Sequence, residues 1–417
     1  MNATQDAFAA LRYRDFSLVT LNQFCLTLAI LIQEIIVAYS LYKITKDPLT
    51  LGLIGLAEAI PYIALSLWGG YFADRFNKQT IMKICLFFAI PLPLVLWGLF
   101  HAYGLKQIEL STLSWGVYAV IFGLGTIRGF YNPSATSLKP FLIPREIYAN
   151  GATRTTIGWQ SGVIIGPMLG GLMLAFLGRE TSFISVAVLL SLCFLLVNLL
   201  SKRTFPKIET ERVLQSLGEG FRFIAKTKIV PWAISLDLVS VLFGGVIALL
   251  PIFAEDILKI GPEGLGYLRA APSIGALITM IALTRFPPTR HAWRNMLLAV
   301  AGFGLFTLLF AYSNYLWLSL FALAMTGACD SISVVIRQTI LQIYPPENMR
   351  GRVAAVNGMF VSSSNELGAF ESGLAAKYLG PVIATVFGGS MTLLVVAFSW
   401  AKTKDLFGVD ITQAEQK

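Results

Sequence analysis

The sequence has few charged residues and almost no histidine. Asp, Glu, Lys and Arg make up 13% of its 417 residues, whereas soluble globular chains average about 25%. The two histidines, His101 and His291, stand alone, so no cluster with metal-ligand spacing is visible. No nucleophile–base constellation and no Walker-type phosphate loop is visible either. These absences argue against an enzyme and against an ATP-driven pump, and the sequence predicts no cofactor and no bound metal.

Cysteine is also sparse, and its placement argues against a disulfide framework. All four cysteines fall within apolar segments, where small buried thiols are common: Cys25, Cys85, Cys193 and Cys329. The first fifteen residues are polar and lack the apolar core of a signal peptide, so we expect no cleavable leader.

Long apolar runs, in contrast, dominate the chain. Hydrophobic residues make up 56% of the sequence, and the mean hydropathy is +0.70. A membrane-spanning helix needs roughly 20 apolar residues, and about twelve stretches meet that need. They lie near residues 17–42, 49–73, 80–103, 113–137, 150–177, 181–201, 229–253, 263–285, 295–312, 315–341, 353–377 and 380–401. The sequence therefore predicts an all-α membrane protein with about 12 transmembrane helices.

The net charge of +9 reflects orientation in the membrane and not nucleic-acid binding. With a cytoplasmic N-terminus, 23 of the 32 lysines and arginines fall in inner loops or at inner helix ends. Six fall outside and three fall inside predicted helices. This is the positive-inside pattern. We therefore expect a protein of the bacterial inner membrane with both termini in the cytoplasm.

The longest internal polar interval, Ser201 to Lys228, divides the predicted helices into two sets of six. It contains an amphipathic segment, Val213 to Ala225, suited to the inner membrane surface. The halves also repeat: Pro144 to Gly178 aligns with Pro346 to Gly380 at an offset of 202, with eight identities. We therefore predict a six-helix half over 1–200, a linker over 201–228, a second six-helix half over 229–402 and a tail over 403–417. The two halves are expected to be related by a pseudo-two-fold axis.

Two motifs suggest function. A short charged turn joins the second and third apolar runs, with Gly70, Asp74, Arg75 and Lys78 at characteristic positions. The alternative reading is a basic loop at the membrane surface. In the fifth run, Gly162, Gly166 and Gly170 recur every four residues on one helix face; the rest of the motif is Pro167 and Gly171. Ordinary helix packing is the alternative here.

These motifs resemble those of the major facilitator superfamily of transporters. The turn is similar to the loop between helices 2 and 3 of that superfamily, although Asn77-Lys78-Gln79 replaces Gly-Arg-Arg. The glycine motif is similar to that of the superfamily's antiporters. Three further stretches look like the drug:proton antiporter branch of the superfamily: Asp47 to Leu53, Leu142 to Glu146 and Pro346 to Val353. The resemblance covers essentially the whole chain. It implies a major facilitator fold, a gating role for the turn and export coupled to proton entry.

Charges inside predicted helices are candidates for function, because a charge at bilayer depth costs several kcal/mol. The alternative is a structural ion pair. Glu34 shares a polar stripe with Gln23 and Thr27, and Arg128 resembles the superfamily's helix-4 arginine linked to proton coupling. We therefore expect Arg128 and Glu34 to meet and Glu34 to carry the proton. The further cavity candidates are Glu58, Asp330, Glu366 and Glu371.

The leading hypothesis is a secondary active exporter of a small amphipathic compound, drug-like or siderophore-like, driven by protons. A lipid-like or lysophospholipid flippase is the second hypothesis, and a non-transporting receptor on a transporter fold is the third. The expected partners are a small-molecule substrate, protons and the lipid bilayer, without nucleic acid, and we expect a monomer.

Overall fold

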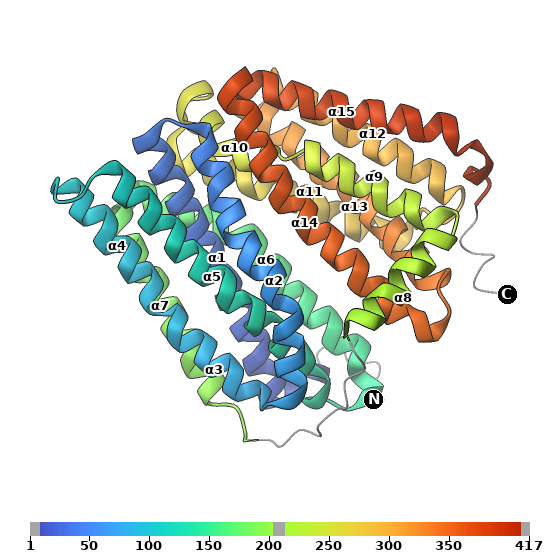
Figure 1. The fold of residues 1–417 in the computed structure, drawn as a ribbon, viewed down its shortest axis with the longest axis horizontal. Coiled ribbons are helices and arrows are strands. Elements are labelled where there is room, and N and C mark those ends of the chain that lie inside the picture. The colour runs from blue at the N-terminus through green and yellow to red at the C-terminus, as the bar shows by residue number, and fades with distance from the viewer. Residues whose placement is uncertain (1–8, 203–212, 410–417) are drawn as a thin grey trace. The chain divides into compact units, whose positions relative to one another are not determined.

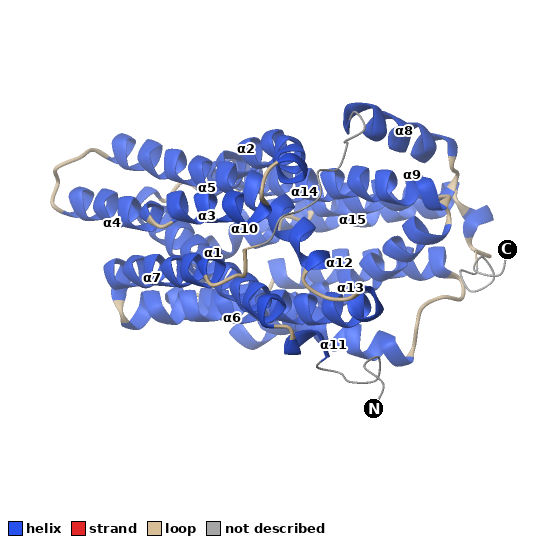
Figure 2. Cartoon of the chain, turned by 90° about the horizontal axis from the view of Figure 1, so that it is seen from below, coloured by secondary structure: helices blue, strands red, loops and turns tan. Residues whose placement is uncertain are grey.

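A computed structural model describes residues 9–202 and 213–409 of the chain. Predictions that concern residues 203–212, including the middle of the linker, and the end of the tail lie outside these described residues. Throughout the described ranges the regular structure is helical, and Figure 2 shows helices joined by short loops. The all-α fold predicted from the apolar runs is confirmed.

The chain separates into two compact units. Unit 1 comprises residues 1–45 and 57–210, and unit 2 comprises residues 46–56 and 211–417. The dividing point after residue 210 falls within the interval predicted as a linker. The first turns of one long helix, α2, belong to unit 2, while the rest of that helix belongs to unit 1. The sequence did not indicate this sharing.

Unit 1 consists of long helices that match the first six apolar runs (Figure 1). Its elements are η1 (Ala9–Arg12), α1 (Arg14–Thr45), α2 (Pro48–Arg75), α3 (Lys78–Ala89), α4 (Pro91–Gly104), α5 (Leu110–Leu138), η2 (Lys139–Phe141), η3 (Arg145–Ile147), α6 (Tyr148–Phe176) and α7 (Gly178–Asn198). One predicted span is split into α3 and α4, because Pro91 supplies no N–H to continue the ladder. Helix α1 packs mainly on α6 and α7.

Unit 2 repeats this plan after the linker. Its elements are α8 (Val213–Lys226), α9 (Ile229–Phe243), α10 (Val246–Ile252), the π-helical η4 (Phe253–Ile257), α11 (Gly261–Arg285), α12 (Ala292–Ala311), α13 (Leu316–Ile343), α14 (Glu347–Leu379), α15 (Pro381–Lys402) and η5 (Lys404–Leu406). The seventh predicted span is split into α9, α10 and η4. Gly244 and Gly245 separate α9 from α10.

The internal repeat is visible in the packing. Helix α6 lies on α1 in unit 1, and α14 lies on α9 in unit 2. The paired glycines at the ends of the two repeat segments, Gly178 and Gly380, both have positive φ, of 77° and 86°. Side chains with a Cβ rarely adopt that conformation, so glycine at both positions allows the same sharp turn into the next helix.

Eleven helices in the described residues are long and apolar enough to cross a membrane. The span predicted near 353–377 is the exception: α14 has 33 residues but is too polar to meet that hydropathy criterion. Its polar face includes Asn357, Ser364 and Ser372, all buried within the protein. Packing against neighbouring helices, and not contact with lipid, therefore accommodates these polar side chains.

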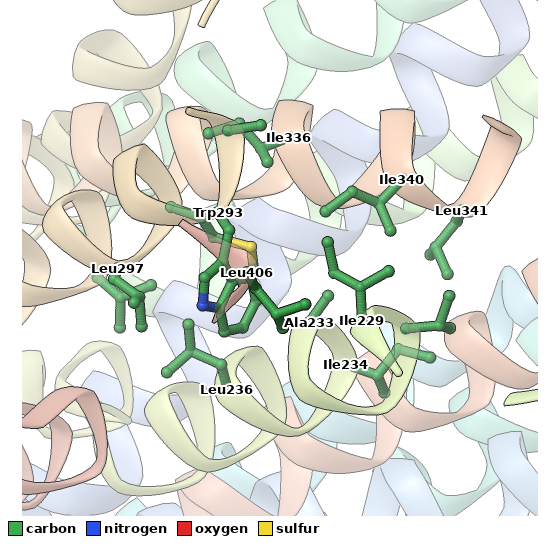
Figure 3. Packing of buried hydrophobic residues seen from close by; sticks show 14 of the residues in the cluster. Ile229, Ala233, Ile234, Leu236, Trp293, Leu297, Ile336, Ile340, Leu341 and Leu406 are labelled. Atoms are coloured by element: carbon green, nitrogen blue, oxygen red, sulfur yellow. The ribbon is translucent and has the colours of Figure 1, made fainter. Parts of the chain in front are cut away.

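A dense apolar cluster organises one end of unit 2 (Figure 3). Trp293 of α12 is fully buried and belongs to this cluster together with Leu297, Ile336 and Ile340. The indole Nε1 donates a hydrogen bond of 2.7 Å to Thr403 Oγ1, so the one polar atom of the ring has a partner. The amphipathic segment of the linker forms α8 and contributes Ile224 to the cluster.

Candidate transport site

An ion pair joins α2 and α5 in unit 1. Arg128 donates to a carboxylate oxygen of Glu58, with side chains that are 31% and 14% exposed. The guanidinium also lies over the ring of Tyr62, 5.4 Å from its centroid. Both charges lie in helices long and apolar enough to span the membrane. Pairing in such a setting offsets much of the cost of removing each charge from water.

Glycine brings the two helices of this pair together. A Cβ on Gly125 would lie 2.2 Å from the carbonyl oxygen of Glu58, and a Cβ on Gly69 would lie 2.1 Å from that of Gly129. No larger residue fits at such distances without moving backbone. The pair therefore sits where small residues let two helices approach closely.

The charged turn is a tight connection, as predicted: α2 ends at Arg75 and α3 begins at Lys78. Asn77 caps α3, and its Oδ1 accepts hydrogen bonds from the backbone N–H groups of Gln79 and Thr80. The Arg75 guanidinium lies 4.7 Å from the centroid of the Tyr71 ring. Lys78 is 1% exposed. Asp74 is half-buried in the last turn of α2.

The glycine motif of α6 lies against α1. Cβ atoms added to Gly162, Gly166 and Gly170 would come within 2.8, 3.0 and 3.1 Å of Thr27, Leu31 and Ile32, respectively. These glycines form one face, as the spacing predicted, and that face determines how closely α1 approaches. Pro167 lies inside the helix between them, and Gly171 is buried.

The polar stripe of α1 takes part in two hydrogen bonds. Thr27 donates to the Gln23 carbonyl, at 2.8 Å, and Lys139 Nζ donates to Gln23 Oε1, at 3.3 Å. Glu34 is half-buried two turns beyond Thr27. The close approach of α6 thus sets the position of the helix that carries Glu34.

A second ion pair, almost fully buried, lies in unit 2. Arg337 of α13 pairs with Asp237 of α9, and the two side chains are 3% and 5% exposed. Asp330, one of the predicted cavity acids, lies two turns before Arg337 on α13. It lines a pocket with Asp237. Sequence reasoning did not place Asp237 in this site. Helical periodicity shows which residues of one helix share a face, but it does not show which residues of two helices meet.

The two predicted acids of α14 lie in different surroundings. A Cβ on Gly55, in the part of α2 that belongs to unit 2, would lie 3.3 Å from Glu366 Oε2. Glu371 is half-buried one turn further on. At the other end of α14, Arg352 pairs with Glu219 of α8, and Phe360 contacts Phe221. The linker helix is thus docked on α14 by one ion pair and one aromatic contact.

Arg128 has an ion-pair partner among the predicted cavity acids. The structure joins Arg128 to Glu58, a candidate that the sequence also named, while the expected meeting of Arg128 with Glu34 stays a prediction. No periodicity signal links positions 70 residues apart on two helices. Gly69 was missed as well, because the motif directed attention to Gly70, where an added Cβ would meet nothing within 4 Å.

Two helical units, eleven apolar spans among the described residues and charged side chains within such spans are typical of a membrane transporter. Sequence comparison identifies the transporter family. The model of the Major Facilitator Superfamily matches residues 19–369, and the chain belongs to this superfamily.

Curated relatives at low identity are efflux proteins. The multidrug efflux pump Tap of Mycolicibacterium fortuitum is 25% identical over 363 residues, covering 82% of this chain and 84% of Tap. The enterobactin exporter EntS of Shigella boydii is 24% identical over 408 residues, covering 91% of this chain and 89% of EntS.

Solved structures share the fold. The nucleoside transporter NupG aligns with a TM-score of 0.70 at 14% identity, covering 97% of this chain and all of that chain. A bacterial homologue of the iron transporter ferroportin aligns with a TM-score of 0.72 at 14% identity, covering 92% and 98%. At these identities the likeness establishes the architecture alone.

Proposed function

We propose that this transporter is a proton-coupled exporter of a small amphipathic compound, drug-like or siderophore-like. The observation that carries the proposal is the Glu58–Arg128 ion pair, which places a titratable acid and a fixed cation together inside membrane-spanning helices. The efflux pump Tap and the exporter EntS, similar over most of the chain, support export and this substrate class.

The pair suits coupling for a simple electrostatic reason. While Arg128 contacts Glu58, the charged carboxylate is stabilised. A carboxylate that loses its cation in apolar surroundings favours the protonated form, because desolvation penalises charge. If an event such as substrate binding separated the two side chains, Glu58 would lose the Arg128 guanidinium as its partner and take up a proton instead. Glu34, on the helix positioned by the α6 glycines, is the second acid we consider for this role.

The test uses inside-out membrane vesicles with ethidium and enterobactin as probes. Uptake that depends on an inward-acid pH gradient, and that stops when an ionophore collapses the gradient, supports the proposal. Gradient-independent translocation of a labelled lysophospholipid would instead favour a flippase. Binding of a probe without flux would favour a receptor.

The acid is then identified by substitution. Glu58→Gln resembles the protonated side chain, so we expect it to lose gradient-driven accumulation while still exchanging probe down its own gradient. Glu34→Gln is measured in parallel, and the exposed Glu109→Gln serves as the matched control. Normal accumulation by Glu58→Gln would show that the coupling acid lies elsewhere.

We propose further that the transporter acts as a monomer in the bacterial inner membrane with both termini in the cytoplasm. The excess of basic residues in the inner loops supports this orientation.

A further inference from the structure

Exposed cations gather at one end of unit 2. A short loop joins the end of α11 to the start of α12, and α12 lies beside α15 (Figure 1). The Ala292 N–H donates a hydrogen bond of 3.1 Å to the Val409 carbonyl, and Trp293 Nε1 donates one of 2.7 Å to Thr403 Oγ1. These two bonds hold the end of α15 and the segment after it beside the start of α12. The basic surface of unit 2 consists of the exposed residues Arg285, Arg290, Arg294, Lys402 and Lys404.

No acid balances this surface in the described part of the chain. None of its five side chains forms an ion pair there, and the neighbouring Asp405 pairs with Lys228. Arg290 and Arg294 also lie at the N-terminal end of α12, where the helix dipole is positive and disfavours cations. The cations therefore repel one another and the helix end, and an external anion would relieve both effects.

The basic surface lies where exposed apolar helix faces end. On α15, Leu394 and Phe398 are exposed, and Lys402 follows four residues later on the same face. On α12, Leu298 is exposed one turn after Arg294, again on one face. Both helices are long and apolar enough to cross a membrane. Their exposed apolar faces suit acyl chains, so the cations at their ends fall at the level of the lipid head groups.

The loop between α11 and α12 adds an aromatic side chain at the same level. Phe286 directly follows Arg285 and is 73% exposed. Pro287 and Pro288 come next, and their fixed φ angles restrict the loop. An exposed aromatic ring beside cations is typical of the membrane–water interface. A site for a soluble phosphate would not require such a ring, so the surface favours a lipid.

We propose that the basic surface of unit 2 binds the phosphate head groups of anionic phospholipids. Five cations without a balancing acid complement a layer of negative head groups. Each lysine or arginine near such a layer strengthens binding about fivefold. The proposal assigns a lipid preference to one surface and requires only that the chain spans a membrane. Its failure would therefore leave the exporter proposal untouched.

The experiment measures thermal unfolding of the purified full chain in dodecyl maltoside micelles. Phosphatidylglycerol is titrated in one series, and phosphatidylcholine, which has no net charge, is titrated in another. A ligand that binds only the folded state raises Tm in a saturable manner. We expect phosphatidylglycerol to raise Tm more than phosphatidylcholine does, and added NaCl to shift half-saturation to higher lipid concentration. Inorganic phosphate and polyglutamate, added at the same ionic strength, are expected to leave Tm unchanged.

Variants identify the basic surface as the origin of the response. The double variant Arg290→Gln with Arg294→Gln is expected to weaken the apparent affinity for phosphatidylglycerol about 25-fold, because each lost charge costs about fivefold. Lys106→Gln with Lys259→Gln is the matched control. It also removes two exposed cations, from loops outside the basic surface, and should keep the wild-type response.

Three results would overturn the proposal. The first is an equal response of the wild-type chain to the two lipids. The second is a response to phosphatidylglycerol that the Arg290 and Arg294 substitutions leave unchanged, or that both double variants lose equally. The third is stabilisation by inorganic phosphate or by polyglutamate without a response to phosphatidylglycerol, which would reassign the surface to a soluble anion or to an acidic protein.

Discussion

At the scale of single residues, the ion pairs differ widely in how far their side chains are exposed. Asp237 and Arg337 are almost completely buried, whereas Lys228 and Asp405 form a pair with side chains 74% and 48% exposed. Buried pairs are costly to break because the remaining partner stays desolvated, while exposed pairs contribute little. The two pairs in unit 2 therefore allow a direct comparison of these cases.

We expect Arg337→Met to lower the free energy of unfolding by about 3–5 kcal/mol, because it leaves Asp237 buried and unpaired. The double variant Asp237→Leu with Arg337→Met should recover most of that loss, since two apolar side chains replace the pair. Thermal unfolding of purified protein provides the measurement. Lys228→Met, at the exposed pair, should change stability by about 1 kcal/mol or less. If Arg337→Met and Lys228→Met lowered the free energy of unfolding by the same amount, the buried pair would not contribute to stability as described.

At the scale of helices, close approach is made possible by glycines that face a neighbouring backbone. Two adjacent glycines near the end of α2 illustrate the difference. Gly69 faces the carbonyl of Gly129, whereas an added Cβ on Gly70 would meet no atom within 4 Å. Only the first of these two residues is needed for α2 to pack on α5 at the observed distance.

We expect Gly69→Ala to destabilise the protein by about 1–3 kcal/mol, because the new methyl group would force the α2 and α5 backbones apart. That shift should also disturb the Glu58–Arg128 pair and reduce transport of ethidium. Gly70→Ala is the matched control, one residue away, and should change stability by about 0.5 kcal/mol or less. Tm and vesicle uptake measured for both variants test the contrast. A larger effect of Gly70→Ala would contradict the packing described.

At the scale of the whole molecule, the chain consists of two units that carry the same arrangement of helices. Helix α6 packs on α1, and α14 packs on α9. A glycine with positive φ follows α6 and another follows α14. Each unit also contains an ion pair between two of its helices. The positive-inside pattern predicts that the basic loops of both units lie on the cytoplasmic side.

Topology is tested with single cysteines at two exposed positions, Phe76 and Gln107. The four native cysteines are buried, so they provide a low background. We expect Gln107→Cys to react with a membrane-impermeant maleimide in spheroplasts, because its loop is predicted to face outward. Phe76→Cys should react only after permeabilisation. Labelling in the reverse order would invert the orientation proposed here.

Much of the architecture followed from the sequence alone. Each apolar run is a local property, and its length relative to a bilayer is sufficient to predict a span. The Gly162 to Gly171 motif likewise predicted a packing face, because helical periodicity determines which residues of one helix share a side. The span near 353–377, which forms part of α14, was predicted as one of the apolar runs, and its segment repeats the segment that contains α6.

The sequence by itself determined the membrane class, the helices, their division near the linker and the set of charges that lie within spans. These depend on composition and on spacing along one chain. Only the tertiary structure decided which charges meet: Arg128 with Glu58, Arg337 with Asp237, and Arg352 with Glu219. It also revealed the pocket beside Asp330 and the sharing of α2 between units. Ion pairing depends on distance in space, and residues 70 to 133 positions apart come together through helix packing that no local pattern encodes.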